Sequence, residues 1–245
     1  MANTRKVALI TGANKGLGFE MARQLAQAGV TVVLAARDPQ KGEAAAEKLR
    51  KEGLDVQFFK LDVTSKQDHA TVAAFLQQKF ERLDILINNA GISAEELGSG
   101  KVSTTTDDVI RRTFEANFFA PVALTQTLLP LLKKSDAGRI VNMSSILGSQ
   151  TLHADPKSPI YDFKSLSYDA SKAALNSFTI HLAHELKDTK IKVNSAHPGW
   201  VKTDMGTDAA PMELPEGGKT GVELALLDDS GPTGGYFHLG KTLPW

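Results

Sequence analysis

The amino-acid sequence predicts an α/β protein with a single Rossmann-type, doubly wound parallel sheet and helices on both faces. Three observations predict this fold class. Apolar runs of strand length alternate with helical patterns along nearly the whole chain, a glycine-rich turn follows the first run, and no repeat, low-complexity tract or linker interrupts the order. The chain is therefore expected to form one domain, residues 1–245.

The expected strands are residues 7–11, 31–36, 56–62, 85–89, 140–144 and 191–196. They are rich in Val, Ile, Leu and Phe without strict alternation, which is typical of parallel strands buried on both faces. The expected helices are residues 19–28, 42–52, 67–80 and 107–134, with a further helix from Tyr168 to near Lys187. Repeated β–α alternation of this kind implies right-handed crossovers.

Two segments lack a regular pattern: residues 146–167, with Pro156 and Pro159, and residues 201–218, with Pro211. Each follows an expected strand, and ligands of open α/β sheets bind beyond the carboxyl ends of strands. Long loops in compact domains are usually functional or disordered. We therefore expect both loops to form the substrate pocket, the alternative being plain surface loops.

Composition excludes several classes of function. Lys plus Arg and Asp plus Glu both number 28, so no net charge attracts nucleic acid or an anionic membrane. The chain has no cysteine, which excludes disulfides, thiolate catalysis and cysteine-ligated metals, and its six histidines are too scattered to predict a metal site. The apolar run within residues 1–10 is too short for a signal sequence or a spanning helix, so a cytoplasmic location is expected.

The first expected strand runs into Thr11-Gly12-Ala13-Asn14-Lys15-Gly16-Leu17-Gly18 and then a helix. Glycines here permit a tight turn, close backbone approach to a diphosphate and close helix–strand packing, while the helix N-terminus attracts phosphate. The spacing differs from the commoner G-x-G-x-x-G, and alone it also fits a plain connection. From its place after the first strand we predict a dinucleotide site. The residues expected to contact it are Gly12, Asn14, Lys15, Gly16, Leu17 and Gly18.

The end of the second expected strand favours NADPH over NADH. It reads Ala35-Ala36-Arg37, without the acid that usually holds the ribose 2′-hydroxyl of NAD. Arg37 can fork onto the oxygens of a 2′-phosphate, and Lys41 and Lys15 can add point charges. The alternative is solvated surface charge. Asp38 is expected to cap the helix that follows.

Tyr168 and Lys172 are four residues apart on an expected helix and so share one face. A tyrosine with an ordinary pKa near 10 is a poor acid–base group at neutral pH. An ammonium group one turn away, together with the nicotinamide cation of an oxidised cofactor, is expected to lower the pKa of the phenol. The alternative is a surface pair.

Two further elements point to the same chemistry. The strand that precedes residue 146 ends in Ser144 and Ser145, and alternation lets only one face a substrate carbonyl and stabilise developing oxyanion charge. Pro121 lies four residues after Asn117 and cannot donate to its carbonyl, so we expect a kink that leaves this carbonyl free for a water linked to Lys172. The alternative is a simple packing kink.

The chain resembles the classical short-chain dehydrogenases/reductases, and among them the NADPH-dependent carbonyl reductases, over nearly its whole length. The motifs that carry the resemblance, in the family's order, are Thr11-Gly12-x-x-x-Gly16-x-Gly18, Asn88-Asn89-Ala90-Gly91, Asn117, Ser145, Tyr168-x-x-x-Lys172 and Pro198-Gly199. The carbonyl-reductase character comes from residues 12–16, 36–38, 117–119, 198–205 and 231–235.

The resemblance implies a catalytic tetrad of Asn117, Ser145, Tyr168 and Lys172. Tyr168 would protonate the alkoxide as hydride arrives from the nicotinamide, and Lys172 would also hold the nicotinamide ribose. The other residues implied to contact the cofactor are Asp62 and Val63 at the adenine, Asn89, Ala90 and Gly91 along the central channel, and Pro198, Gly199, Val201 and Thr203 at the nicotinamide amide.

The expected reaction is carbonyl–alcohol interconversion with NADPH/NADP+, favouring reduction of ketones, aldehydes or quinones. The alternatives are a narrow-substrate alcohol dehydrogenase of the steroid or terpenoid type and a non-catalytic NADP(H)-binding sensor, against which the intact Ser145, Tyr168 and Lys172 argue. The expected partner is a small carbonyl compound, without nucleic acid or membrane. The segment between Ser145 and Tyr168 is longer than in typical members but shorter than the insertion of monomeric carbonyl reductases, so monomer and homo-oligomer both stay open.

Overall fold

The computed structural model describes residues 5–245. The expectation about a signal sequence concerned residues 1–10, and the first four of these lie outside the described residues. The centre of the structure is one eight-stranded sheet in the order β3-β2-β1-β4-β5-β6-β7-β8. The strands are β1 (Val7–Ile10), β2 (Thr31–Ala36), β3 (Val56–Lys60), β4 (Ile85–Asn88), β5 (Arg139–Met143), β6 (Lys192–Ala196), β7 (Tyr236–His238) and β8 (Lys241–Thr242). All neighbours pair in parallel except β7 and β8, which are antiparallel. The predicted fold class is confirmed.

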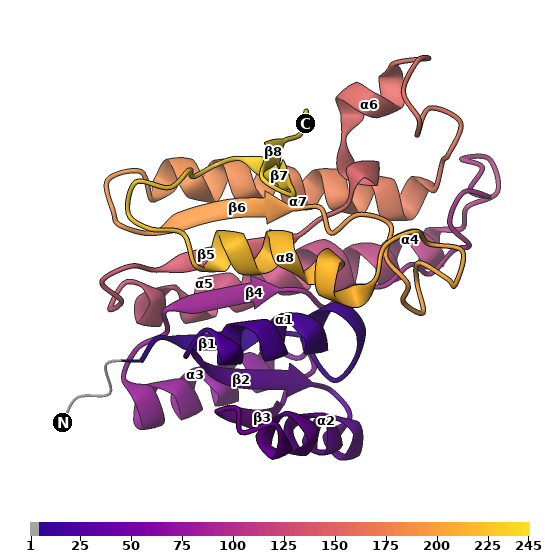
Figure 1. Ribbon diagram of the computed structural model, residues 1–245. Helices are drawn as coiled ribbons and strands as arrows, with labels where there is room; N and C mark the ends of the chain where they lie inside the picture. The colour runs from indigo at the N-terminus through magenta and orange to yellow at the C-terminus, as the bar shows by residue number, and fades with distance from the viewer. Residues whose placement is uncertain (1–4) are drawn as a thin grey trace.

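Eight α-helices of the described residues connect and cover these strands. They are α1 (Gly16–Gln27), α2 (Pro39–Lys51), α3 (Lys66–Phe80), α4 (Asp107–Phe114), α5 (Ala120–Leu132), α6 (Gln150–Ala154), α7 (Leu166–Glu185) and α8 (Leu214–Ala225). The sheet separates two apolar cores, so the molecule has three layers (Figure 1). Within residues 5–245, no helix has both the length and the apolar character needed to cross a membrane.

The strands divide their side chains between the two cores, as buried parallel strands do. On β1, Ala8 and Ile10 join the core that α1, α2 and α8 cover, whereas Val7 and Leu9 join the core under α3, α5 and α7. β1, β2 and β4 are buried along their whole length and therefore lack a solvent-exposed polar face. This is why the strand positions follow from the apolar runs.

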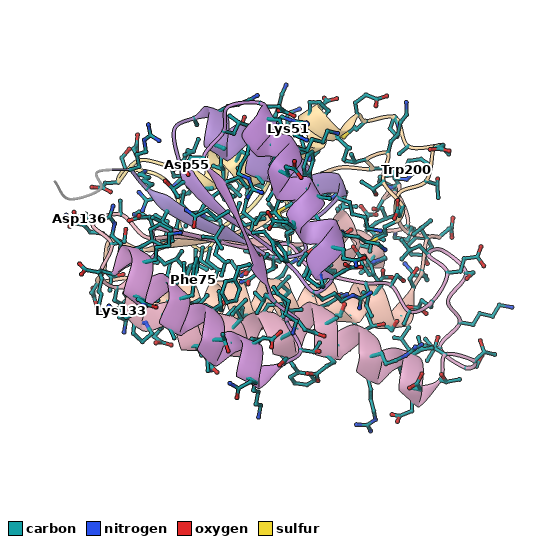
Figure 2. All side chains as sticks on the ribbon, turned by 90° about the horizontal axis from the view of Figure 1, so that it is seen from below. Lys51, Asp55, Phe75, Lys133, Asp136 and Trp200 are labelled. Carbon is teal, nitrogen blue, oxygen red and sulfur yellow. The ribbon has the colours of Figure 1, made fainter. Side chains whose placement is uncertain are left out.

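The strand order changes direction between β1 and β4, which lie side by side although β2 and β3 separate them in sequence. Such a switch point opens a crevice at the carboxyl ends of the strands, where open α/β sheets bind ligands. The turn after β1 and the loop after β4 both reach this end. Trp200, after β6, also lies there, at the opposite end of the molecule from Lys133 and Asp136 (Figure 2).

Two helix boundaries differ from the prediction. The loop expected over residues 201–218 ends earlier, because α8 begins at Leu214 with Pro215 in its first turn, where the missing N–H is harmless. Position 217 of this helix is a glycine because the chain packs tightly there: a Cβ atom would lie 2.5 Å from the side chain of Val201. The helix expected over residues 107–134 is α4 and α5 joined by a π-helical turn, Glu115–Phe119.

Four short elements were not predicted. The loop of residues 146–167 contains a 3₁₀ turn, Ile146–Gly148, and the five-residue helix α6. The strands β7 and β8 extend the sheet beyond β6 with three and two residues. Elements this short leave too little periodicity for a pattern to be recognised.

Candidate active site

A cavity of about 1330 Å³ opens at the carboxyl ends of the strands. It is larger than the 300–1,000 Å³ typical of a single small-molecule pocket. Except for Asn117 and Lys41, all the predicted site residues line it. They are Gly12, Asn14, Lys15, Gly16, Leu17, Gly18, Arg37, Asp62, Val63, Asn89, Ala90, Gly91, Ser145, Tyr168, Lys172, Pro198, Gly199, Val201 and Thr203.

The glycine turn after β1 fits closely against the loop after β4. Gly12 has a φ of +63°, and a Cβ atom on it would lie 2.9 Å from the Cα atom of Ala90. A Cβ atom on Gly18 would lie 2.5 Å from the amide nitrogen of Asn89. That amide donates to the carbonyl oxygen of Thr11 at 2.8 Å, and the Thr11 hydroxyl accepts the N–H groups of Asn89 and Ala90, both at 3.0 Å. Thr11, which was not among the predicted site residues, thus joins the two loops.

The three predicted phosphate-binding cations lie in different surroundings. Arg37, at the end of β2, lines the cavity and forms no ion pair or hydrogen bond within residues 5–245. Lys15 pairs with Asp204 of the loop after β6. Lys41 does not line the cavity and lies 3.8 Å from Asp38, which caps α2 as predicted by accepting the N–H groups of Gln40 and Lys41.

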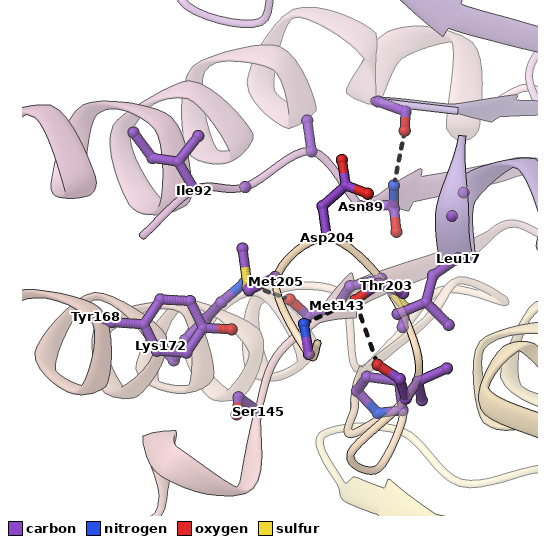
Figure 3. Close-up of a pocket in the computed structure, with 18 of the residues that line it drawn as sticks. Leu17, Asn89, Ile92, Met143, Ser145, Tyr168, Lys172, Thr203, Asp204 and Met205 are labelled. Atoms are coloured by element: carbon purple, nitrogen blue, oxygen red, sulfur yellow. Dashed lines mark hydrogen bonds between the residues drawn. The ribbon is translucent and has the colours of Figure 1, made fainter. Parts of the chain in front are cut away.

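Tyr168 and Lys172 lie one turn apart on α7 with their side chains together (Figure 3). The ammonium nitrogen of Lys172 lies 5.5 Å from the centre of the Tyr168 ring and donates to the carbonyl oxygen of Met143 at 2.8 Å. The two side chains are buried, with relative exposures of 6% for Tyr168 and 5% for Lys172. The expected shared face is therefore observed.

The expectation that Lys172 lowers the pKa of the phenol is wrong for the protein by itself. Burial raises the pKa of Tyr168 to about 12, and a hydrogen bond with Ser145 works in the opposite direction without offsetting it. Burial also lowers the pKa of Lys172 to about 8. Both shifts favour the neutral form, because a buried group loses the hydration that stabilises its charge. At neutral pH the phenol is protonated and most of the lysine is still charged.

The structure distinguishes the two serines that follow β5. Ser145 interacts with the hydroxyl of Tyr168, and its Oγ also accepts the N–H group of Leu147 at 3.3 Å. Ser144 is more deeply buried, and its hydroxyl has no hydrogen-bond partner within residues 5–245. The strand therefore turns Ser145 toward Tyr168, as the resemblance implied.

Asn117 lies in the π-helical turn and is 1% exposed. Its amide oxygen accepts the N–H group of Ile92 at 2.8 Å, and its amide nitrogen donates to the Ile92 carbonyl at 2.9 Å and to Ser171 Oγ at 3.0 Å. The predicted proline kink is a π turn, a feature frequent at functional sites. The side chain of Asn117 thus joins the loop after β4 to α7 beneath the cavity.

His197, at the end of β6, lines the cavity although sequence reasoning gave it no role. Its Nδ1 atom accepts the N–H groups of Ile146 at 3.1 Å and Gly199 at 3.4 Å, so its proton is on Nε2. Burial and the neighbouring His238 lower the pKa of His197 to about 3, which keeps the ring neutral. The ring connects the segments that carry Ser145 and Pro198–Gly199. A lone histidine before Pro-Gly gave no signal for this contact.

The outer part of the cavity is mainly apolar. It is bounded by the loop after β4, by residues 146–167 and by residues 201–213, as expected for the two predicted pocket loops. The apolar side chains there are Ile92, Leu97, Ile146, Leu147, Ile160, Phe163, Trp200 and Met205. Across residues 5–245, no three His, Asp or Glu side chains group closely enough to hold a metal ion.

Comparisons with known proteins agree with this geometry. The family model "short chain dehydrogenase" matches residues 6–214. The chain is 34% identical to (-)-isopiperitenone reductase of Mentha piperita, covering 99% of both proteins, and 34% identical to the NADPH carbonyl reductase 1 of Mus musculus, covering both completely. A solved structure of NADPH-bound carbonyl reductase from chicken fatty liver superposes with a TM-score of 0.84 at 29% identity, over 98% of this chain and 99% of that one.

The family model spans most of the chain, and the relatives match over their full length. The strand order, the glycine turn after β1 and the pairing of Tyr168 with Lys172 on one helix are all present in a single cavity. The chain belongs to the short-chain dehydrogenase/reductase family.

Proposed function

We propose that this protein is an NADPH-dependent reductase that transfers hydride to the carbonyl group of a ketone, aldehyde or quinone, with Tyr168 as the general acid. One observation carries the proposal: the buried Tyr168–Lys172 pair lies in the same cavity as the glycine turn. The dinucleotide site and the proton donor therefore lie in the same cavity. The relatives named as reductases and dehydrogenases support the same class of reaction.

The residues present fit NADPH. Any side chain at Gly12 or Gly18 would collide with the loop after β4, so the turn keeps its backbone open to a diphosphate. Arg37 lines the cavity at the end of β2 with its guanidinium uncommitted within the described residues, as binding of a 2′-phosphate requires. When bound, NADPH supplies the hydride. The remaining residues that would hold it are those of the central channel and of the Pro198–Thr203 segment.

Tyr168 is suited to give a proton rather than to take one. With a pKa of about 12 the phenol is protonated at physiological pH, and a carbonyl oxygen that gains charge as its carbon is reduced can accept that proton. Ser145 Oγ, beside the phenol, can donate a hydrogen bond to the same oxygen. The ammonium group of Lys172 then stabilises the phenolate that remains. Burial excludes water from this transfer.

The outer cavity favours apolar carbonyl compounds, because Ile92, Phe163, Trp200 and Met205 are partly exposed around it. A second candidate is a narrow-substrate alcohol dehydrogenase of the terpenoid type. It is favoured by the similarity to isopiperitenone reductase and to the (+)-neomenthol dehydrogenase of Arabidopsis thaliana, which is 35% identical over 96% of both chains.

The test is oxidation of NADPH and of NADH over a panel of ketones, aldehydes, quinones and cyclic terpenoid ketones, together with reduction of NADP+ over cyclic terpenoid alcohols. We expect turnover of several apolar carbonyl compounds, with a lower KM for NADPH than for NADH. Turnover of one terpenoid substrate alone supports the second candidate. Binding of NADPH without turnover of any compound contradicts both.

A further inference from the structure

The catalytic helix α7 does not cap its own N-terminus. The first N–H groups of an α-helix have no partner inside the helix, and a Ser at the N-cap usually accepts one of them. Ser165 is the N-cap residue of α7, but its hydroxyl makes no such bond and instead accepts the N–H group of Gly98 at 2.7 Å. The cap of the helix that carries Tyr168 must come from elsewhere in the chain.

Glu95 supplies it. One carboxylate oxygen, Oε1, accepts the N–H group of Ser167 at 2.7 Å, the N–H group of Tyr168 at 3.1 Å and the hydroxyl of Ser167 at 2.6 Å. Ser167 and Tyr168 are the second and third residues of α7, the two whose N–H groups an N-cap side chain normally accepts. A negative charge at this place also interacts favourably with the helix dipole.

We propose that Glu95 is a positioning residue for Tyr168, whose carboxylate fixes the first turn of α7 relative to the loop after β4. The proposal rests on the function proposed above, in which Tyr168 is the proton donor. Glu95 lies four residues after Gly91, in the segment that continues from the cofactor channel. The same segment bonds to α7 a second time through Gly98 and to the preceding residue Lys164 through the N–H group of Gly100 at 3.0 Å.

Asp169 completes the arrangement. Its Oδ2 atom accepts the N–H group of Ser165 at 2.8 Å, so it satisfies the donor that Glu95 does not reach. Its Oδ1 atom and Oε2 of Glu95 are both buried without a hydrogen-bond partner among residues 5–245. A glutamine at position 95 keeps an oxygen that can accept from Ser167 and Tyr168, and its amide nitrogen can donate where the second carboxylate oxygen lies.

This property makes Glu95→Gln the informative variant. We expect it to keep most of the wild-type kcat, because it retains an acceptor of the same length for Ser167 and Tyr168. Glu95→Ala removes the acceptor, and Glu95→Asp withdraws it by one methylene group. Both should lower kcat by about 10- to 100-fold, the effect expected when a catalytic group is displaced by about 1 Å. Glu96→Ala is the matched control, since Glu96 is the exposed neighbour.

The dissociation constant of NADPH, measured by fluorescence titration, should remain near the wild-type value in every variant, because Thr11 rather than Glu95 holds the loop at Asn89 and Ala90. Amide hydrogen exchange gives a readout that needs no turnover. The amides of Ser167 and Tyr168 should exchange faster in Glu95→Ala and Glu95→Asp, and at the wild-type rate in Glu95→Gln and Glu96→Ala.

Wild-type kcat in Glu95→Asp, or a loss in Glu95→Gln as large as in Glu95→Asp, would overturn the proposal. Unchanged exchange at Ser167 and Tyr168 in Glu95→Asp would overturn it as well. These outcomes are distinct from failure of the proposed function, which would appear as a wild-type protein without reductase activity. If Glu95→Ala does not fold, the comparison of the Asp and Gln variants still decides the question.

Discussion

The ammonium group of Lys172 is the residue-scale feature that sets the pH range of the site. Its pKa falls from an ordinary value of 10.5 to about 8 because the side chain is buried. The group is charged below that pH and neutral above it, so stabilisation of the Tyr168 phenolate is lost as pH rises through about 8. Tyr168, with a pKa of about 12, stays protonated across this range.

We therefore predict that kcat/KM for NADPH, which reports the free enzyme, falls about tenfold per unit above pH 8. The measurement is steady-state reduction between pH 6 and 10. The Lys172→Arg variant keeps a charged side chain at this pH. Its remaining kcat/KM should therefore show no decline above pH 8. A wild-type profile that is level to pH 10 would show that the charge of Lys172 does not assist the reaction.

Substitutions of Arg37 and Lys41 test which cationic side chains bind the 2′-phosphate of the cofactor. The structure places Arg37 on the cavity and Lys41 outside it beside Asp38, although the sequence predicted a role for both. Arg37→Ala should raise KM for NADPH by about tenfold, the loss of a charge-assisted hydrogen bond to phosphate, and should leave KM for NADH almost unchanged. Lys41→Ala should change neither value. Equal effects of the two substitutions on KM for NADPH would contradict the geometry.

At the scale of the secondary-structure element, the start of α7 holds a carboxyl group with an unusual affinity for protons. Burial, assisted by the charge of Glu95, raises the pKa of Asp169 to about 7. The folded protein therefore binds this proton more tightly than the unfolded chain, whose carboxyl titrates near 3.8. It follows that the free energy of unfolding falls as pH rises from about 4 to 7.

Asp169→Asn should remove this effect, since the amide oxygen can still accept the Ser165 N–H group. We predict that the Tm of the variant exceeds that of the wild type by about 2–4 °C at pH 8, equivalent to about 1 kcal/mol in a chain of this size. At pH 4, where this loss has barely begun, the difference between the two proteins should be much smaller. Differential scanning calorimetry at the two pH values makes the comparison. The same difference at both would contradict a titration of Asp169.

The elements also show what sequence reasoning can and cannot reach. The strands β1 to β6 and the helices α1, α2, α3, α5 and α7 follow from apolar runs and caps such as Asp38, because these signals are local. The π turn at Asn117 was expected only as a kink, since a proline signals a disturbance without its geometry. Glu95 could not be found at all: it caps a helix 72 positions further along the chain. Nothing in the sequence around Glu95 indicates this role, which arises only when the loop after β4 folds against α7.

At the scale of the whole molecule, the amino ends of the strands provide stability and the carboxyl ends provide the site. Arg139, at the start of β5, is 1% exposed. Its guanidinium donates to the carbonyl oxygens of Leu227 at 2.9 Å and Lys190 at 3.1 Å and lies 3.3 Å from Asp229. It thus joins three segments at the end of the sheet opposite to Tyr168.

Arg139→Ala removes a buried guanidinium and the hydrogen bonds by which it joins these segments, so we predict a loss of about 3 kcal/mol in the free energy of unfolding. Chemical denaturation measures it, with Arg111→Ala as the control, because Arg111 is an exposed partner of Asp107 on α4. The control should change stability by less than about 0.5 kcal/mol. At 25 °C kcat should be unchanged in both. A large fall in kcat for folded Arg139→Ala would contradict the separation of the two ends.

The sequence indicated most of the residues that meet at the cavity, but it did not indicate their ionisation states. Tyr168 and Lys172 share a face as their spacing requires, and Ser145 rather than Ser144 faces them. The fall in the pKa of the phenol, expected from Lys172 and an oxidised nicotinamide, does not occur in the protein by itself, because burial raises that pKa. Burial is a property of the folded chain and has no local signature in the sequence.

The most direct test of the account is Tyr168→Phe, which removes one hydroxyl and preserves the ring in its buried position. NADPH binding is measured by fluorescence titration and reduction by single-turnover absorbance with the best carbonyl substrate of the panel. The account predicts nearly wild-type NADPH affinity and a rate of reduction lowered at least about 100-fold, the contribution of a positioned general acid. Reduction at the wild-type rate in this variant would contradict it.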